Sequence, residues 1–275
     1  MTSTEQLKTY VDTWWSAIGD LITLLEELPE PDWDLATDLP GWDVRAIASH
    51  VAHLEGLSGG APREEAEVPE SDHIRSPMGQ FTEIGVLTRR DAPRAAIIDE
   101  IRRYSSVRHD ELFASLPEDP GAPAPGVFGA IGWSNAKLLR NRPLDLWLHE
   151  QDIRRATGRP GNLDTAGARH TADYLLEGVG FVLAKKAGAD PGTTLLVEVE
   201  GHTPRSFGVT PDGKGVPLTN SLATPVEAPT VTLSTDRETY VLLAGGRSSA
   251  DPARVKIDGD TTLGTKIVEN LNITP

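Results

Sequence analysis

The sequence of 275 residues contains no cysteine. This absence excludes disulfides, thiolate metal ligands and a cysteine nucleophile, so any thiol chemistry must use a thiol supplied by another molecule. No stretch approaches the roughly 18 consecutive apolar residues that a membrane-spanning helix needs. The first ten residues, MTSTEQLKTY, lack the basic and apolar segments of a signal peptide. We therefore expect a cytoplasmic protein without a membrane partner.

Basic residues are few relative to acidic ones, with 26 Lys and Arg against 41 Asp and Glu and a formal net charge of −15. A protein with this charge repels phosphate backbones, so we expect no nucleic-acid partner. The acidity otherwise favours solubility and carries no information about the fold. The length is sufficient for two domains of ordinary size.

Tryptophan is absent after residue 150, because all six tryptophans lie in the part of the chain before it. In this first half, apolar residues recur at helical spacing, and capping and breaking residues divide them into four long segments. The predicted helices, at about 3–25, 44–57, 94–116 and 134–158, indicate a helix bundle. A polar stretch at 58–79 joins the second and third of them. It is interpreted either as a lid or binding loop or as a mobile surface loop.

The second half begins with a fifth helical pattern, at about 165–186, and then changes character. Short runs rich in Val, Thr and Leu, bounded by turn residues, predict strands at 193–201, 205–211, 228–235 and 255–260. Helices are predicted after Thr235, which forms a capping box with Glu238, and at 261–271. The predicted fold class is α+β in two domains: a four-helix bundle at 1–160 and a smaller α+β domain at 161–275.

Two histidines lie on the second predicted helix, and helical phase distinguishes them. At 100° per residue the apolar residues of this helix centre near about 300°, while His50 falls at about 240° and His53 at about 180°. We therefore predict that His50 points into the bundle and that His53 does not. Taken alone, an inward histidine is more often a satisfied core residue than a metal ligand.

Asp145 and His149 are four residues apart on the fourth predicted helix, so they share one face with apolar residues. A carboxylate on an inward face must be paired or must coordinate a cation. Asp145 either accepts a hydrogen bond from His149 or Arg142, or joins His50 and His149 as three ligands of a divalent metal. Such a set suits zinc first, and also nickel, iron(II) or manganese, and its open position is typical of catalytic sites. Asp152 either orients a ligand or forms a surface ion pair.

Three segments resemble the mycothiol-dependent maleylpyruvate isomerase family of actinobacteria. LPGWDVRAIASHVAHL and RPLDLWLHEQDIRRATGRPG are similar to the two ligand-bearing segments of its DinB-like, metal-binding four-helix bundle, and VKIDGDTTLGTKIVENL is similar to its sterol-carrier-like C-terminal domain. The resemblance implies that His50 and His149 are metal ligands. Asp145 stands where the family has a glutamate ligand, one methylene longer.

The resemblance also implies a chemistry. The family uses a divalent metal and mycothiol as a thiol cosubstrate for isomerisation of, or addition to, a small electrophile of the maleylpyruvate type. An arginine of the C-terminal domain lies near the substrate carboxylate in the family, and Arg247 is the candidate for this catalytic role. The alternative is a non-enzymatic small-molecule or lipid-binding protein with a degenerate metal site. The expected oligomeric state is a monomer or a homodimer.

Overall fold

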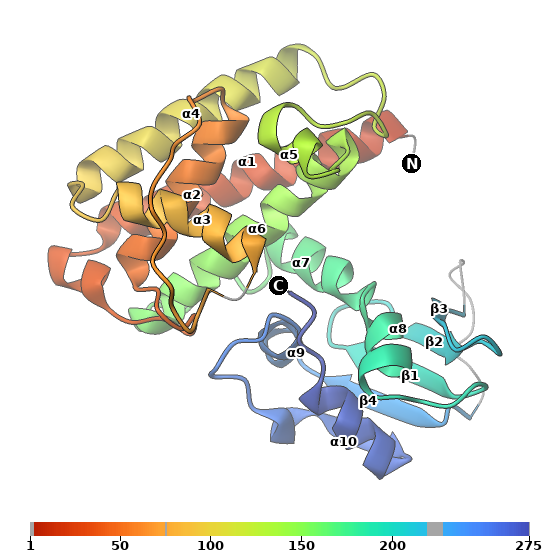
Figure 1. Cartoon of the computed structure of the whole chain (residues 1–275). Helices are drawn as coiled ribbons and strands as arrows, with labels where there is room; N and C mark the ends of the chain where they lie inside the picture. Colours follow the sequence, from red (N-terminus) through yellow and green to blue (C-terminus); the bar gives the residue numbers. More distant parts are fainter. Residues whose placement is uncertain (1–2, 75, 219–227, 275) are drawn as a thin grey trace. The chain divides into compact units, whose positions relative to one another are not determined.

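The computed structural model of the chain describes residues 3–74, 76–218 and 228–274. The chain forms two compact units, Met1–Asn162 and Leu163–Pro275 (Figure 1). The first unit is helical in its described residues, and the second contains a five-stranded sheet with helices. The α+β fold class predicted from the sequence is therefore confirmed. None of the helices in the described ranges is long and apolar enough to span a bilayer.

Four long helices make up most of the first unit, as helical spacing and capping residues predict. Asp43 accepts a hydrogen bond from the Ala46 amide at 2.7 Å at the start of α2, and Ser134 accepts one from the Lys137 amide at 3.2 Å at the start of α6. In the core, α1 packs against α6, and α2 packs against α4. The bounds are α1 Ser3–Glu27, α2 Val44–Ser58, α4 Arg94–Ala114 and α6 Asn135–Ala156.

A further helix, α3 (Pro77–Thr88), begins inside the polar stretch at 58–79 and packs against α2. Its N-terminus is defined by Ser76, whose hydroxyl accepts a hydrogen bond from the Gly79 amide at 3.0 Å, and by proline at the first helical position. The interpretation of this stretch as a loop up to residue 79 is wrong at its end, because Ser-Pro can start a helix as well as a turn. Two short elements complete the unit: η1 Glu30–Asp34 and α5 Gly126–Ala130.

The second unit is built on a sheet with the strand order β3-β2-β1-β4-β5. The central pair, β1 and β4, is parallel, and the other three pairs are antiparallel. Four strands lie within the predicted runs, whereas β3 has three residues, too few for alternation to reveal it. The bounds are β1 Thr194–Val199, β2 Arg205–Val209, β3 Gly215–Pro217, β4 Val231–Thr235 and β5 Lys256–Gly259.

The helix predicted at 165–186 is divided into three parts in the structure. α7 (Ala166–Leu176) is followed by a short α8 (Val179–Phe181) and a π-helical turn, η2 (Val182–Lys186). Gly178 lies at the division, where a Cβ would be only 2.5 Å from Cγ2 of Ile273. Ile273 of the C-terminal segment thus packs closely on the backbone where the predicted helix is interrupted. The apolar periodicity continues across this interruption and does not reveal it.

Two more helices belong to this unit: α9 packs against α7, and α10 packs against β4 and β5. The N-cap of α9 is Asp236, whose carboxylate accepts a hydrogen bond from the Thr239 amide at 2.8 Å. The capping box predicted at Thr235 is therefore wrong by one residue, because aspartate competes as an N-cap at least as well as threonine. The bounds are α9 Arg237–Ala244, η3 Pro252–Arg254 and α10 Thr261–Glu269.

Candidate metal centre

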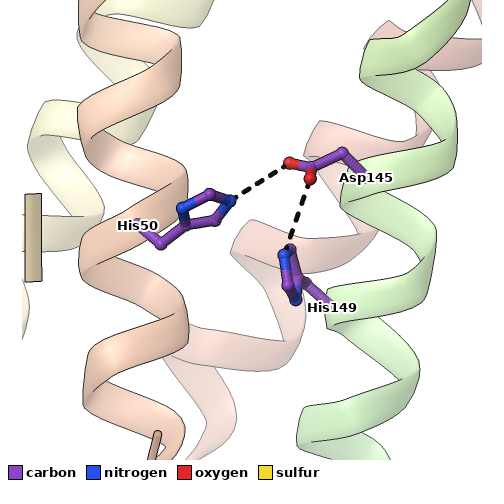
Figure 2. Close-up of side chains that lie close together, drawn as sticks. All are labelled: His50, Asp145 and His149. Atoms are coloured by element: carbon purple, nitrogen blue, oxygen red, sulfur yellow. Dashed lines mark ion pairs between the residues drawn. The ribbon is translucent and has the colours of Figure 1, made fainter. Parts of the chain in front are cut away.

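Two helices of the first unit bring three potential ligands together. α2 supplies His50, and α6 supplies Asp145 and His149, one turn apart (Figure 2). One ligand atom from each residue lies within 4.8 Å of the others. The two histidines are 3% and 7% exposed, so the group lies inside the bundle and not on its surface.

The distances within this group fit a cation better than they fit direct hydrogen bonds. His50 Nε2 is 3.5 Å from Asp145 Oδ2, and His149 Nε2 is 3.6 Å from Asp145 Oδ1. Good N–H···O hydrogen bonds are shorter, at about 2.7–3.2 Å. Ligands about 2.0–2.1 Å from a tetrahedral zinc ion are separated from one another by roughly 3.3 Å. Both ring nitrogens of His50 are buried and lack a hydrogen-bond partner among the described residues, so the donor set fits a metal.

An indole ring forms one side of the group. The ring centroid of Trp42 lies 5.0 Å from that of His50 and 6.0 Å from that of His149. Trp42 Nε1 donates a hydrogen bond of 2.9 Å to the buried carboxylate of Glu83 on α3. α3, which periodicity did not predict, therefore fixes a residue that packs against two of the potential ligands.

Burial and charge set the protonation of the three side chains. Burial lowers the pKa of His50 to about 4 in spite of Asp145, so this imidazole is neutral near pH 7 and able to coordinate a metal. Burial also opposes the charged form of His149, but the carboxylates of Asp145 and Asp152 outweigh it and raise the pKa of His149. Burial alone would raise the pKa of Asp145, yet the guanidinium of Arg142 and the two imidazoles hold it well below its usual range. Asp145 is therefore ionised.

Asp152 lies behind His149 on α6. Its side chain is 0% exposed, with Oδ2 3.3 Å from His149 Nδ1 and Oδ1 2.5 Å from Nη2 of Arg155. The interpretation of Asp152 as part of a surface ion pair is wrong in its burial, although the pair with Arg155 does form. The carboxylate lies where it can orient the His149 ring, as carboxylates beside metal-bound histidines do.

His53 is buried, contrary to the prediction from helical phase. It is 2% exposed, and its Nδ1 lies 2.7 Å from Oε2 of Glu64, away from the group around Asp145. α3 covers this side of α2 so closely that a Cβ on Gly85 would lie 2.3 Å from Cβ of His53. The phase argument assumes one buried face, whereas α2 is covered by α3 on one side and by α4 and α6 on others.

Arg142 and Glu55 belong to the surroundings of the site, and sequence analysis missed Glu55. Arg142 donates from Nη1 to Asp145 Oδ2 at 3.0 Å, and from Nε and Nη2 to Glu55 Oε1 at 3.1 and 2.7 Å. Glu55 is 0% exposed and Arg142 4%. Helical phase could have indicated the burial of Glu55. At 100° per residue it falls at about 20°, beside Val44 and Val51 on the apolar stripe of α2.

Arg247 lies in the second unit, after α9. It is 8% exposed, and its Nη1 donates a hydrogen bond of 2.6 Å to the carbonyl of Gly245. The guanidinium is thus held against the C-terminal end of α9, where carbonyl groups attract a cation. Its role near a substrate carboxylate stays a prediction.

Comparisons with known proteins cover both units. The mycothiol maleylpyruvate isomerase N-terminal domain matches residues 14–154, and the C-terminal domain of the same family matches residues 169–265. A crystal structure of the mycothiol-dependent maleylpyruvate isomerase has 19% sequence identity and a TM-score of 0.52, with 94% of this chain and 96% of that chain covered. A crystal structure of a mutant of that enzyme, with a histidine replaced by alanine, has 18% identity and a TM-score of 0.54 over the same shares. No curated protein sequence matches the chain. With matches to both of its domains, this chain belongs to the mycothiol-dependent maleylpyruvate isomerase family.

Proposed function

We propose that the chain is a metal-dependent enzyme that uses a low-molecular-weight thiol, mycothiol, to isomerise or add to a small electrophile of the maleylpyruvate type. The observation that carries the proposal is the geometry at Asp145, whose two oxygens lie 3.5 and 3.6 Å from imidazole nitrogens of two helices. Family membership supplies the thiol and the substrate class. The absence of cysteine agrees with a thiol that comes from a cosubstrate.

His50, Asp145 and His149 would hold the metal, with zinc preferred by a set of two imidazoles and one carboxylate. A divalent ion held there with an open position would lower the pKa of a coordinated thiol and so supply a nucleophile at neutral pH. Around it, Asp152 orients the His149 ring and Trp42 closes one side of the site. Arg142 holds the carboxylate of Asp145 from the side of the core.

Arg247 is proposed to bind the carboxylate of the substrate. A guanidinium recognises a carboxylate through two parallel N–H donors, a geometry that lysine lacks. We expect Arg247→Lys to raise KM for a carboxylate substrate with little change in metal content. An unchanged KM would contradict the proposal that Arg247 binds the substrate carboxylate.

The rival is a non-enzymatic small-molecule or lipid-binding protein with a degenerate metal site. One contact favours it: the ion pair of 3.0 Å between Arg142 and Asp145 can satisfy the carboxylate without a metal. A metal analysis of the purified protein distinguishes the two. Stoichiometric metal, with loss of affinity in His149→Ala, supports the enzyme. No bound metal, together with unchanged affinity in His149→Ala, contradicts it.

Activity is then tested on the metal-loaded protein with mycothiol and maleylpyruvate, followed by a panel of other small electrophiles. We expect turnover that requires both the metal and the thiol. Turnover that persists after chelation, or without the thiol, would contradict the proposed chemistry while leaving the family membership intact.

A further inference from the structure

A chain of buried polar contacts leads from the core to the carboxylate of the metal centre. Trp14 on α1 donates its indole N–H to both carboxylate oxygens of Glu55 at 3.2 Å. Glu55 accepts two hydrogen bonds from Arg142, and Arg142 donates to Asp145. Trp14, Glu55 and Arg142 are 3%, 0% and 4% exposed, so these contacts form away from solvent.

The buried ion pair of Glu55 and Arg142 is not explained by its contribution to stability. A buried carboxylate and a buried guanidinium each lose hydration, and apolar residues of similar volume usually stabilise a core at least as well as a buried ion pair does. The ion pair of Glu55 and Arg142 also contacts Asp145, through Nη1 of the guanidinium. The guanidinium contacts the same oxygen, Asp145 Oδ2, that faces His50 Nε2, so it fixes the direction in which the carboxylate points.

The charges also bear on the affinity of the centre for a cation. Arg142 places a positive charge on the ligand side chain itself, and an isolated positive charge there would oppose a divalent ion. Glu55 compensates that charge through two N–H donors of the same guanidinium. With Glu55 in place, Arg142 orients Asp145 without adding an uncompensated positive charge to the centre.

We propose that Glu55 is a positioning residue of the metal centre: it holds and neutralises Arg142, and through Arg142 it aims the carboxylate of Asp145 at the metal. The inference rests on the proposed function, since it requires that the centre binds a metal. It predicts that a group which touches neither the metal nor its ligands controls metal affinity. Residues beside metal ligands commonly change affinity by about 10–100-fold when they are altered.

The test compares Zn²⁺ dissociation constants, measured by competition with a chelator, in the full-length wild-type chain and in Glu55→Gln. The substitution keeps the shape and removes the charge, and we expect affinity to fall by about 10–100-fold. The matched control is Glu100→Gln, which neutralises a carboxylate that binds Arg89 in the same unit without contacting the centre. We expect its Zn²⁺ affinity to stay close to that of the wild type.

Two further measurements separate positioning from stability. Co²⁺ serves as a spectroscopic probe, and we expect its absorption bands in Glu55→Gln to differ from those of the wild type, a change that lower stability alone does not produce. Trp14→Phe removes the indole donor to Glu55, together with part of the ring volume in the core, and keeps both charges. If Glu55→Gln fails to fold, this variant carries the test, and we expect a smaller loss of Zn²⁺ affinity in the same direction.

The outcomes are distinct. Zn²⁺ binding by Glu55→Gln that equals wild-type binding, with the same Co²⁺ spectrum, overturns the positioning role and leaves the proposed function standing. Unchanged Zn²⁺ affinity in Trp14→Phe overturns it where that variant replaces Glu55→Gln. A wild-type chain without affinity for either metal overturns the proposed function and this inference together.

Discussion

If His50, Asp145 and His149 bind a metal as proposed, its removal should lower the unfolding temperature of the first unit, because these ligands would tie α2 to α6. A ligand that binds only the folded state stabilises it by about 2.7 kcal/mol at a free concentration 100 times its Kd. For a unit of the size of Met1–Asn162, each kcal/mol corresponds to roughly 2–4 °C. We therefore expect chelation to lower the midpoint by about 5–10 °C at that saturation. His149→Ala should melt near the chelated wild type, whether or not metal is added.

Tryptophan fluorescence is a selective assay for this transition, since all six tryptophans lie in the first unit. The control is His109→Ala, which removes a histidine of α4 that stacks on Trp15 at 4.1 Å and is no member of the candidate metal group. This variant should keep the full metal-dependent shift. If His149→Ala and His109→Ala shift equally with metal, or if the wild type shows no shift, the assignment of the ligands is refuted.

Three other predictions follow from single contacts. Asp145→Glu should weaken Zn²⁺ binding, measured by competition with a chelator. The aspartate oxygens already lie 3.5 and 3.6 Å from the imidazole nitrogens, a spacing suited to shared coordination, and another methylene would move the carboxylate out of this position. Equal or tighter binding would refute this reasoning. Asp236→Ala should cost about 1 kcal/mol of unfolding free energy through loss of the α9 cap. Burial opposes ionisation of Asp236, but hydrogen bonds from the first turn of α9 lower its pKa, so the cost is largest above the usual value near 3.8 and decreases as pH falls through the lowered pKa. A cost that stayed constant or grew as pH fell would contradict this sign. Gly85→Ala should destabilise the chain by about 1–3 kcal/mol, since its Cβ would meet His53, whereas Gly19→Ala, with open space around it, should stabilise it by about 0.5–1 kcal/mol in the same denaturation assay; equal effects would refute the packing argument.

Much of the architecture could be predicted from the sequence because it depends on local periodicity. The four long helices, four of the five strands and the α+β class follow from apolar spacing, caps and turn residues. Elements too short to show a period, such as β3 and α5, could not be predicted in this way. α3 was missed because its first residues continue a polar, proline-containing stretch.

The candidate site was predictable where its members share a face of one helix. Asp145 and His149 are one turn apart, and His50 lies on the flank of an apolar stripe. The burial of His53 and the role of Glu55 depend on contacts with other segments: His53 contacts Glu64 in the stretch between α2 and α3, and Glu55 contacts Arg142 on α6. Spacing along one helix carries no information about which neighbour covers its second face.

The polar residues buried along α2 restrict the rotation of this helix about its own axis. The other buried residues of α2 are mainly small or aliphatic. Apolar packing alone would therefore distinguish poorly between different rotations of the helix about its axis. A rotation by one residue, about 100°, would separate His50 from Asp145, His53 from Glu64 and Glu55 from Arg142 at the same time. Buried polar pairs of this kind can specify a register even where they add little stability. These pairs therefore favour a single rotational position of α2 in the bundle, with His50 directed toward Asp145.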